Sequence, residues 1–366
     1  MRALSVRTLG IRAFRNLIGV ELEFGPRLNV LSGDNGQGKT NTLEALYVLA
    51  TSRSFRTSRL VDLVPVGTET ASLRGEILES GEKREQTIGL RKGLRAVRVE
   101  GKRPPTLAAY AVQTPMVVFH SGALGLASGG GKERRRLLDR IALYESPASL
   151  GETEAYVKAL WSRQRVLEAR GTGAADLDGW EELISRHGVA ISEGRAAAAA
   201  RLHPEVRSAF ARLGPAGLDL GMTYRRGSPA SMDEFRLELA RSRGRDRARR
   251  STSAGPHRDD LLLSLSGKPV REMASQGQQR ALVLALELAE ISVIGSIRGV
   301  VPILLMDDVS SELDRRVTAA LFSVLRSARG QVFLTTTRPE LIDSSGCLGG
   351  QDRLDFRVAG GRIGRA

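Results

Sequence analysis

Short apolar runs separated by glycine-containing turns dominate both ends of the chain. In the N-terminal part they predict strands at residues 4–9, 20–24, 28–31, 71–78, 85–90 and 96–99. After residue 255 the pattern resumes, with strands expected at 261–265, 303–306 and 332–335. Helical repeats begin near residues 277 and 315, each between two of these strands. The order of strands and helices predicts an α/β fold.

The middle of the chain has a different character. Between about residues 125 and 250, Ala- and Arg-rich segments have helical periodicity, with breaks expected at Pro147, Gly171 to Gly173, Pro204 and Gly214 to Pro215. Helices broken in this way do not give the sustained heptads of a long coiled coil. We therefore expect a mostly helical arm at 125–250, inserted into a head formed by 1–124 and 251–366.

One glycine-rich segment carries the strongest chemical signal. Residues 33–40 fit the pattern G-x-x-x-x-G-K-T, directly after the predicted strand 28–31 and at the start of a helical repeat. Backbone N–H groups of such a loop surround phosphates, Lys39 reaches the β- and γ-phosphates, and the Thr40 hydroxyl ligates Mg²⁺. The sequence therefore predicts an ATP and Mg²⁺ site. The residues expected to bind the nucleotide are Gly33, Asp34, Asn35, Gly36, Gln37, Gly38, Lys39 and Thr40.

Two carboxylates follow the buried strand 303–306. Asp307 is expected to hold the metal, and Asp308 to orient or deprotonate the water that attacks the γ-phosphate. Upstream, Ser275, Gly277 and Gln278 form a small polar turn that opens a helix. From the residues alone this turn is equally compatible with a second phosphate site and with a plain helix cap.

Charge points to a polyanionic partner. The 366 residues carry a formal net charge of +14, and no apolar run is long enough to span a bilayer. Cys347 is the single cysteine, which together with the charged N-terminus leads us to expect a cytoplasmic protein. Because only 4% of residues are aromatic, we expect contacts to duplex phosphates rather than base stacking.

Three basic clusters are candidate DNA contacts. They lie at 53–59, at 132–136 and at 241–250, and each is also compatible with a solvated surface or, at 134–136, with a structural role. The residues selected from them are Arg53, Arg56, Lys132, Arg134, Arg135 and Arg245.

The order of these motifs, followed by Ser-Glu-Leu-Asp at 311–314, resembles the ABC-type ATPase heads of the SMC class. More narrowly, it resembles the RecF family of bacterial recombination mediators. Supporting segments lie at 14–17, 132–139, 255–261 and 335–337, so the resemblance spans nearly the whole chain.

The resemblance implies roles for particular residues. Ser275 and Gly277 of one copy would contact the γ-phosphate held by the loop of another, so that ATP joins a homodimer, and Gln278 belongs to the same turn. Asp314 would communicate between the copies. Gln113 would sense Mg²⁺, and Arg12 and Arg15 would approach the nucleotide, although a solvated strand edge explains these two arginines equally well.

The resemblance also implies a function. We expect an ATP-dependent clamp on duplex or gapped DNA that acts with RecO and RecR to load RecA at single-strand gaps, with a weak, DNA-stimulated ATPase. Asp308 stands where ABC transporters have Glu, and its shorter carboxylate favours slow hydrolysis. Thr335 to Thr337 stand where transporters have His. The energy subunit of a membrane transporter and an architectural SMC-type protein are the rival functions, and the basic charge and the lack of heptads disfavour them.

Overall fold

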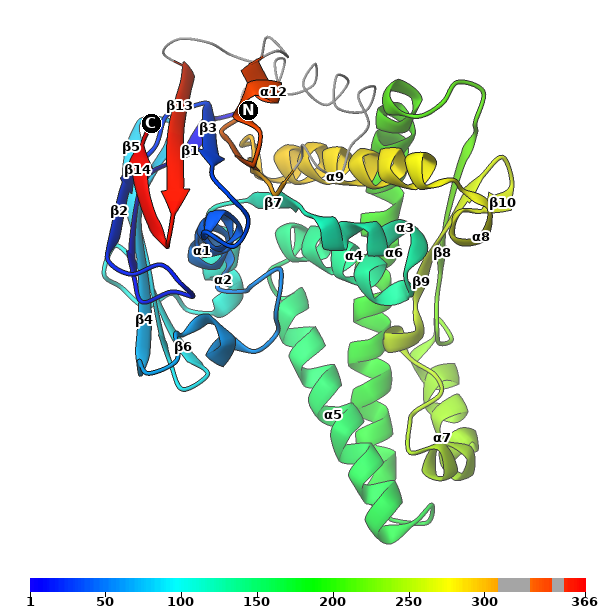
Figure 1. The fold of residues 1–366 in the computed structure, drawn as a ribbon. Coiled ribbons are helices and arrows are strands. Elements are labelled where there is room, and N and C mark those ends of the chain that lie inside the picture. Colours follow the sequence, from blue (N-terminus) through cyan, green and yellow to red (C-terminus); the bar gives the residue numbers. More distant parts are fainter. Residues whose placement is uncertain (309–329, 344–351) are drawn as a thin grey trace. The chain divides into compact units, whose positions relative to one another are not determined.

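The computed structural model describes residues 1–308, 330–343 and 352–366 (Figure 1). It divides into two compact units. The head comprises Met1–Ala123 and Leu284–Ala366, and the arm unit comprises Leu124–Val283. No helix in the described ranges is long and apolar enough to cross a membrane.

The central sheet of the head has the strand order β14-β13-β3-β12-β11-β7. Its strands are β3 (Leu28–Ser32), β7 (Met116–Phe119), β11 (Ile303–Met306), β12 (Val332–Thr336), β13 (Arg353–Ala359) and β14 (Arg362–Arg365). All neighbours from β13 to β7 pair in parallel. The strands expected at 28–31, 303–306 and 332–335 are confirmed, whereas β7, β13 and β14 were not predicted. The carboxyl ends of β3 and β11 therefore meet at one edge of the sheet.

A second, antiparallel sheet has the order β2-β1-β4-β5-β6. Its strands are β1 (Leu4–Arg12), β2 (Val20–Glu23), β4 (Thr70–Glu79), β5 (Glu82–Arg91) and β6 (Leu94–Val99). Alternate residues of β4 are buried, as expected for a sheet with one solvated face. The apolar face joins a core that includes Leu43 and Leu46 of α1 (Lys39–Thr51) and Phe333 of the central sheet. The described part of the head also contains the short helices η1 (Leu60–Leu63), α2 (Leu107–Ala111) and α12 (Pro339–Asp343).

The arm unit is built mainly from helices. After η2 (Ser121–Leu124) come α3 (Gly125–Ser128), α4 (Gly131–Glu145), α5 (Ser149–Arg170), α6 (Leu177–Leu213) and α7 (Met232–Arg249). A small antiparallel sheet contains β8 (Leu220–Arg225), β9 (Asp260–Leu265) and β10 (Lys268–Pro269). Two short helices, η3 (Pro256–Arg258) and α8 (Val270–Met273), flank β9 and β10, and α9 (Gln276–Arg298) continues into the head.

The arm unit extends beyond residue 250, where the sequence analysis ended the insert. The reason is the pairing of β8 with β9, from Leu220 opposite Leu265 to Arg225 opposite Asp260. Hydrogen bonds between distant segments cannot be read from local composition. The head and arm assignment by residue ranges stays a prediction.

The break expected at Pro204 is wrong, because Pro204 lies inside α6, a helix of 37 residues. Proline cannot donate to the carbonyl one turn earlier, which weakens a helix locally. Leu202 and Val206 are fully buried on either side of Pro204, and this packing holds the helix together. Helices α5 and α6 pack side by side (Figure 1). Because α5 ends at Arg170, the described residues contain no long coiled coil, as predicted.

Candidate nucleotide-binding site

The glycine-rich loop joins β3 to α1 in the head, as the sequence predicts. Two of its glycines could not be replaced without rearrangement. Gly33 has φ +152°, and a Cβ atom there would lie 2.3 Å from the carbonyl oxygen of Val358. Gly38 has φ +120°, and its Cβ would lie 3.0 Å from Asn16 Oδ1 and from the Leu17 side chain. The loop thus needs glycine both for its backbone conformation and for the close approach of its neighbours.

Contacts from Asn16 and from the turn at Gly360 and Gly361 hold the middle of this loop through Gln37. The carbonyl of Gln37 accepts hydrogen bonds from Gly361 N at 2.9 Å and from Asn16 Nδ2 at 3.2 Å. Its side-chain oxygen accepts from Gly360 N at 2.6 Å. Gly360 and Gly361 form the turn between β13 and β14, which the sequence analysis did not connect with the site. The adjacent glycines were the available signal for a tight turn, but they do not say what it contacts.

Lys39 is buried at the first position of α1. Its Nζ donates to the carbonyl oxygens of Gly33 at 2.7 Å and Asp34 at 2.8 Å. Burial lowers the pKa of the ammonium, and the negative charges of Asp308, Asp307 and Asp34 oppose this shift. The ammonium is therefore held inside the loop, where an entering phosphate would meet it.

Thr40 and Asp307 converge where a metal ion is expected. The Thr40 hydroxyl lies 2.8 Å and 3.0 Å from the two carboxylate oxygens of Asp307. The Asp307 backbone N–H donates to the Phe119 carbonyl at 2.8 Å, which fixes the residue at the end of β11 beside β7. A hydroxyl and a carboxylate meeting at a loop that would surround phosphates fit Mg²⁺, which prefers few protein oxygen ligands plus phosphate oxygens.

Thr335 contacts both acidic residues of the site. Its hydroxyl donates to Asp307 Oδ1 at 2.8 Å and accepts from the backbone N–H of Asp308 at 2.8 Å. Asp308 has φ +49°, the left-handed conformation that Asp tolerates better than most residues. The sequence analysis used Thr335 only as part of the family resemblance, and the structure adds its role in holding Asp307 and Asp308.

The metal-sensing role expected for Gln113 is contradicted by the register of β7. Met116 pairs with Ile303 and Phe119 with Met306, so Gln113 precedes the strand, at the opposite edge of the sheet from Asp307. The Gln113 Nε2 donates to Ala109 O at 3.2 Å. Without a prediction of β7, the sequence could not show on which side of the sheet Gln113 lies.

His120 follows β7 directly, at the edge of the sheet where Asp307 lies. Its ring lies against Phe55, with 5.2 Å between the ring centroids.

The two arginines expected near the nucleotide differ in their contacts. Arg15 forms a bidentate pair with the fully buried carboxylate of Glu44, at 3.0 Å and 2.9 Å. Arg56, a DNA candidate, contacts the same carboxylate at 3.2 Å. Arg15 and Arg56 therefore share a structural partner, the buried carboxylate of Glu44. Arg12 is exposed at the end of β1, and its approach to a nucleotide stays a prediction.

The small polar turn of Ser275, Gly277 and Gln278 lies in the arm unit, at the start of α9. The Ser275 N–H donates to Gln278 Oε1 at 2.8 Å, and the Gln278 N–H donates to Ser275 Oγ at 3.3 Å. This reciprocal pair is a capping box. Ser275 and Gly277 remain exposed. The Ser-Glu-Leu-Asp segment with Asp314, the helix expected near residue 315 and Cys347 all lie outside the described residues.

The basic cluster at 132–136 has largely structural contacts. Arg134 is buried and bonds both carboxylate oxygens of Asp260, at 2.8 Å and 3.0 Å. Arg135 donates to the Asp259 carbonyl at 2.8 Å, and Arg136 pairs with Glu133. The structure thus contradicts a free DNA-contacting role for Arg134 and Arg135. Lys132 remains exposed, as does Arg53 in the head.

The cluster on α7 keeps most of its positive charge available. Arg243 pairs with Asp178 and Glu181, and Arg245 bonds Ser253 Oγ at 2.8 Å. Other arginines of this cluster are exposed and form no ion pair with any residue that the structure describes. They are Arg241, Arg247, Arg249 and Arg250.

Comparison with known proteins identifies the family. The family model "RecF/RecN/SMC N terminal domain" matches residues 5–350. A protein of Anaeromyxobacter sp. (strain Fw109-5) named "DNA replication and repair protein RecF" is 41% identical over 365 residues, which cover 97% of this chain and 98% of that protein. The chain belongs to the RecF family. A RecF of Myxococcus xanthus (strain DK1622) is 38% identical, over 97% of this chain and 96% of its own.

Solved structures agree with this assignment. The RecF structure described as "recombination mediator protein RecF-ATP in RecFOR pathway" aligns with 100% of this chain and 98% of its own, with a TM-score of 0.88 and 25% identity. The Smc head domain from Pyrococcus furiosus shares the fold alone, with a TM-score of 0.57 and 15% identity. The predicted ABC-type ATPase head is confirmed, and this RecF-family member is a DNA replication and repair protein.

Proposed function

We propose that this RecF-family protein is an ATP-gated clamp on DNA. Two copies close around ATP and Mg²⁺, the closed homodimer holds duplex or gapped DNA, and slow hydrolysis releases it. The observation that carries the proposal is the meeting of the Thr40 hydroxyl and the Asp307 carboxylate beside the Lys39 loop. The relatives named RecF and the ATP-bound RecF structure support the same assignment.

Each side chain of the site has a task in this proposal. Lys39 exchanges its bonds to the Gly33 and Asp34 carbonyls for bonds to phosphate oxygens. Bound Mg²⁺ neutralises charge on the phosphates. Thr40 and Asp307 hold it, and Thr335 keeps the Asp307 carboxylate in place. Asp308 orients the attacking water, and its short side chain makes hydrolysis slow.

Ser275 is suited to act on the nucleotide of the other copy. Its oxygen accepts the Gln278 N–H in the capping box, so its own hydrogen remains available for a γ-phosphate oxygen. The start of α9 adds the positive end of the helix dipole. We therefore propose that Ser275 and Gly277 complete the site in trans, which explains why ATP would be needed for dimerisation.

Arg241, Arg247, Arg249 and Arg250 are the preferred DNA contact. They are exposed and form no ion pair with a described residue. By contrast, Arg134 is paired with Asp260, and Arg135 donates to the Asp259 carbonyl. Because aromatic residues are few, binding should be sequence-neutral and should fall steeply with salt, by about 0.9 log units per log unit of salt for each phosphate contact. We further propose that DNA stimulates a weak ATPase from this surface.

The proposed partners follow from the family. One RecF structure is described within the RecFOR pathway. We propose that this chain acts with RecR and RecO to place RecA at single-strand gaps, in the cytoplasm.

Light scattering tests the clamp. Wild type and Lys39→Met are measured with and without ATP-Mg²⁺ and a gapped duplex, with the exposed Lys102→Met as a matched control for the loss of one charge. We expect ATP-dependent dimers of wild type and Lys102→Met that DNA stabilises, and monomers of Lys39→Met. A wild-type monomer insensitive to ATP and to DNA would disprove the proposal.

A further inference from the structure

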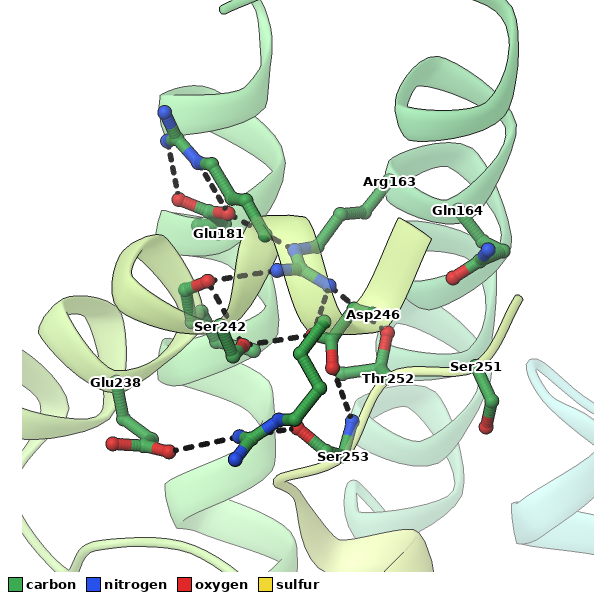
Figure 2. A network of polar contacts seen from close by, with 12 residues as sticks. Arg163, Gln164, Glu181, Glu238, Ser242, Asp246, Ser251, Thr252 and Ser253 are labelled. Atoms are coloured by element: carbon green, nitrogen blue, oxygen red, sulfur yellow. Dashed lines mark hydrogen bonds and ion pairs between the residues drawn. The ribbon is translucent and has the colours of Figure 1, made fainter. Parts of the chain in front are cut away.

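A fully buried guanidinium joins three helices of the arm unit (Figure 2). Arg163 of α5 has 0% of its side chain exposed. It donates to Glu181 of α6 at 3.0 Å, to Asp246 of α7 at 2.9 Å and to the Leu239 carbonyl of α7 at 2.8 Å. A fourth bond, of 3.1 Å, reaches the Thr252 hydroxyl in the segment after α7. One side chain of α5 thus contacts α6, α7 and the segment after α7.

The partners of Arg163 are themselves buried ions. The side chains of Glu181 and Asp246 are 1% and 0% exposed. Arg243 of α7 also bonds Glu181, and this hydrogen bond raises the pKa of Arg243. Well-packed apolar side chains often give the same or greater stability than buried ion pairs, since the ions lose their hydration. The network is therefore better explained by a need to hold α7 in one position than by stability alone.

The buried residues of α7 change from apolar to polar along the helix. They are Phe235, Leu239, Ser242 and Asp246, of which the first two are apolar and the last two polar. Ser242 Oγ bonds Asp246 Oδ2 at 2.8 Å, and both lie next to the Arg163 guanidinium (Figure 2). The C-terminal half of α7, which carries Arg247 and Arg249, is therefore held by polar contacts to Arg163 rather than by apolar packing.

The same network fixes the segment that follows α7. Asp246 Oδ1 accepts from Ser253 N at 3.0 Å, and Thr252 bonds Arg163. The Thr252 carbonyl contacts His257 Nε2 at 2.9 Å, just before β9. The chain from the arginines of α7 to β9 is thus positioned by one connected set of hydrogen bonds.

We propose that Arg163 is a positioning residue that fixes the arginine-bearing end of α7 for contact with DNA phosphates. The inference rests on the proposed DNA-binding function. It adds to that function a residue that is fully buried and therefore cannot touch DNA itself. Without Arg163, Asp246 and Glu181 lose a buried positive partner. The end of α7 then loses its fixed position, and the side chains of Arg247 and Arg249 are no longer held in place for contacts with phosphates.

The test compares Arg163→Met with Arg165→Met, which removes one exposed positive charge from the same helix. Duplex binding is measured over a range of salt, together with hydrogen exchange of 240–250 and ATPase activity with and without DNA. We expect Arg163→Met to weaken binding about tenfold and to lower the salt slope by about two, the loss of two phosphate contacts. Exchange at 240–250 should rise, DNA-free ATPase should be unchanged, and Arg165→Met should resemble wild type.

A second variant separates position from stability. The double change Arg163→Met with Asp246→Leu removes one positive and one negative buried charge, so it should regain much of any loss in melting temperature. We expect its DNA binding and its exchange at 240–250 to stay impaired. If DNA binding and hydrogen exchange at 240–250 both return to wild-type values along with the melting temperature, the positioning role is overturned.

Two measurements separate a failure of the proposed DNA surface from a failure of the Arg163 inference. Arg247→Ala with Arg249→Ala tests the DNA surface directly, whereas hydrogen exchange reports on α7 without DNA. Normal DNA binding by that double variant would reject the surface, and unchanged exchange in Arg163→Met would reject the inference.

Discussion

The hydroxyl of Thr40 lies 2.8 Å from Oδ1 of Asp307, although 267 positions separate them in sequence. Parallel pairing of β3 with β12 and of β12 with β11 brings them together. The site thus depends on three strands being in register, and its chemistry can be tested at the residues that hold it.

Thr335→Val should impair catalysis more than nucleotide binding. The change removes the donor to Asp307 and the acceptor for the Asp308 N–H while keeping the shape of the side chain. We expect kcat to fall about tenfold or more, since the Asp307 carboxylate and the Asp308 backbone both lose the bond that holds them. ATP affinity should change little because Lys39 and the loop are intact. Steady-state ATPase assays and nucleotide titrations measure the two effects, with the exposed Thr337→Val as control. Equal loss of affinity and kcat would contradict this role.

Gly33→Ala and Gly36→Ala form a matched pair in the nucleotide loop. Both positions have positive φ, but a Cβ at Gly33 meets the Val358 carbonyl at 2.3 Å, whereas one at Gly36 has no atom within 4 Å. We expect Gly36→Ala to cost about 1 kcal/mol of unfolding free energy from backbone strain. Gly33→Ala should cost more and abolish ATP binding, because β13 must move away. Chemical denaturation and ATP titration measure both, and equal effects would show that the close approach is unimportant.

Arg134→Ala should destabilise the protein rather than affect DNA directly. Arg134 is buried against Asp260, whose pKa is raised by burial but lowered overall by its hydrogen bond and charge interaction with Arg134. Loss of the partner leaves a partly buried carboxylate, and the unfolding free energy should fall by about 3 kcal/mol. Denaturation at pH 7 measures this. The exposed Arg136→Ala, which loses only its pair with Glu133, should change stability by less than about 1 kcal/mol.

His257 should make stability depend on pH near neutrality. Burial lowers the pKa of its ring below the usual value, and the ring contacts Tyr156 OH at 2.7 Å and the Thr252 carbonyl at 2.9 Å. Because the unfolded chain binds the proton more tightly, the stabilisation is present above the unfolded pKa of about 6.5 and is lost as pH falls through the folded pKa. Unfolding free energies from pH 5 to 8 should rise with pH in wild type.

His257→Gln should reduce that slope, and His203→Gln should keep it. A slope that persists unchanged in His257→Gln would assign the pH dependence to other groups.

The sequence predicted those parts of the site that depend on local patterns. Lys39 and Thr40 end the glycine-rich loop that follows one predicted strand, and Asp307 directly follows another. The structure brings all three together. Thr335 and Gly361 were not given their roles, because these depend on which strands are neighbours. The error at Gln113 had the same origin, since an unpredicted strand decides its side of the sheet. Arg134 was a DNA candidate because charge is visible in a sequence and a buried partner at Asp260 is not.

The contacts of Gln37 also have a consequence for biosynthesis. Strand β3 lies between β12 and β13, and the loop is held by Gly360, which follows Gln37 by 323 residues. A ribosome has to add all of those residues before the loop gains this support. During translation the nucleotide loop therefore lacks this support until Gly360 has been added, and we expect binding of ATP to be a late event.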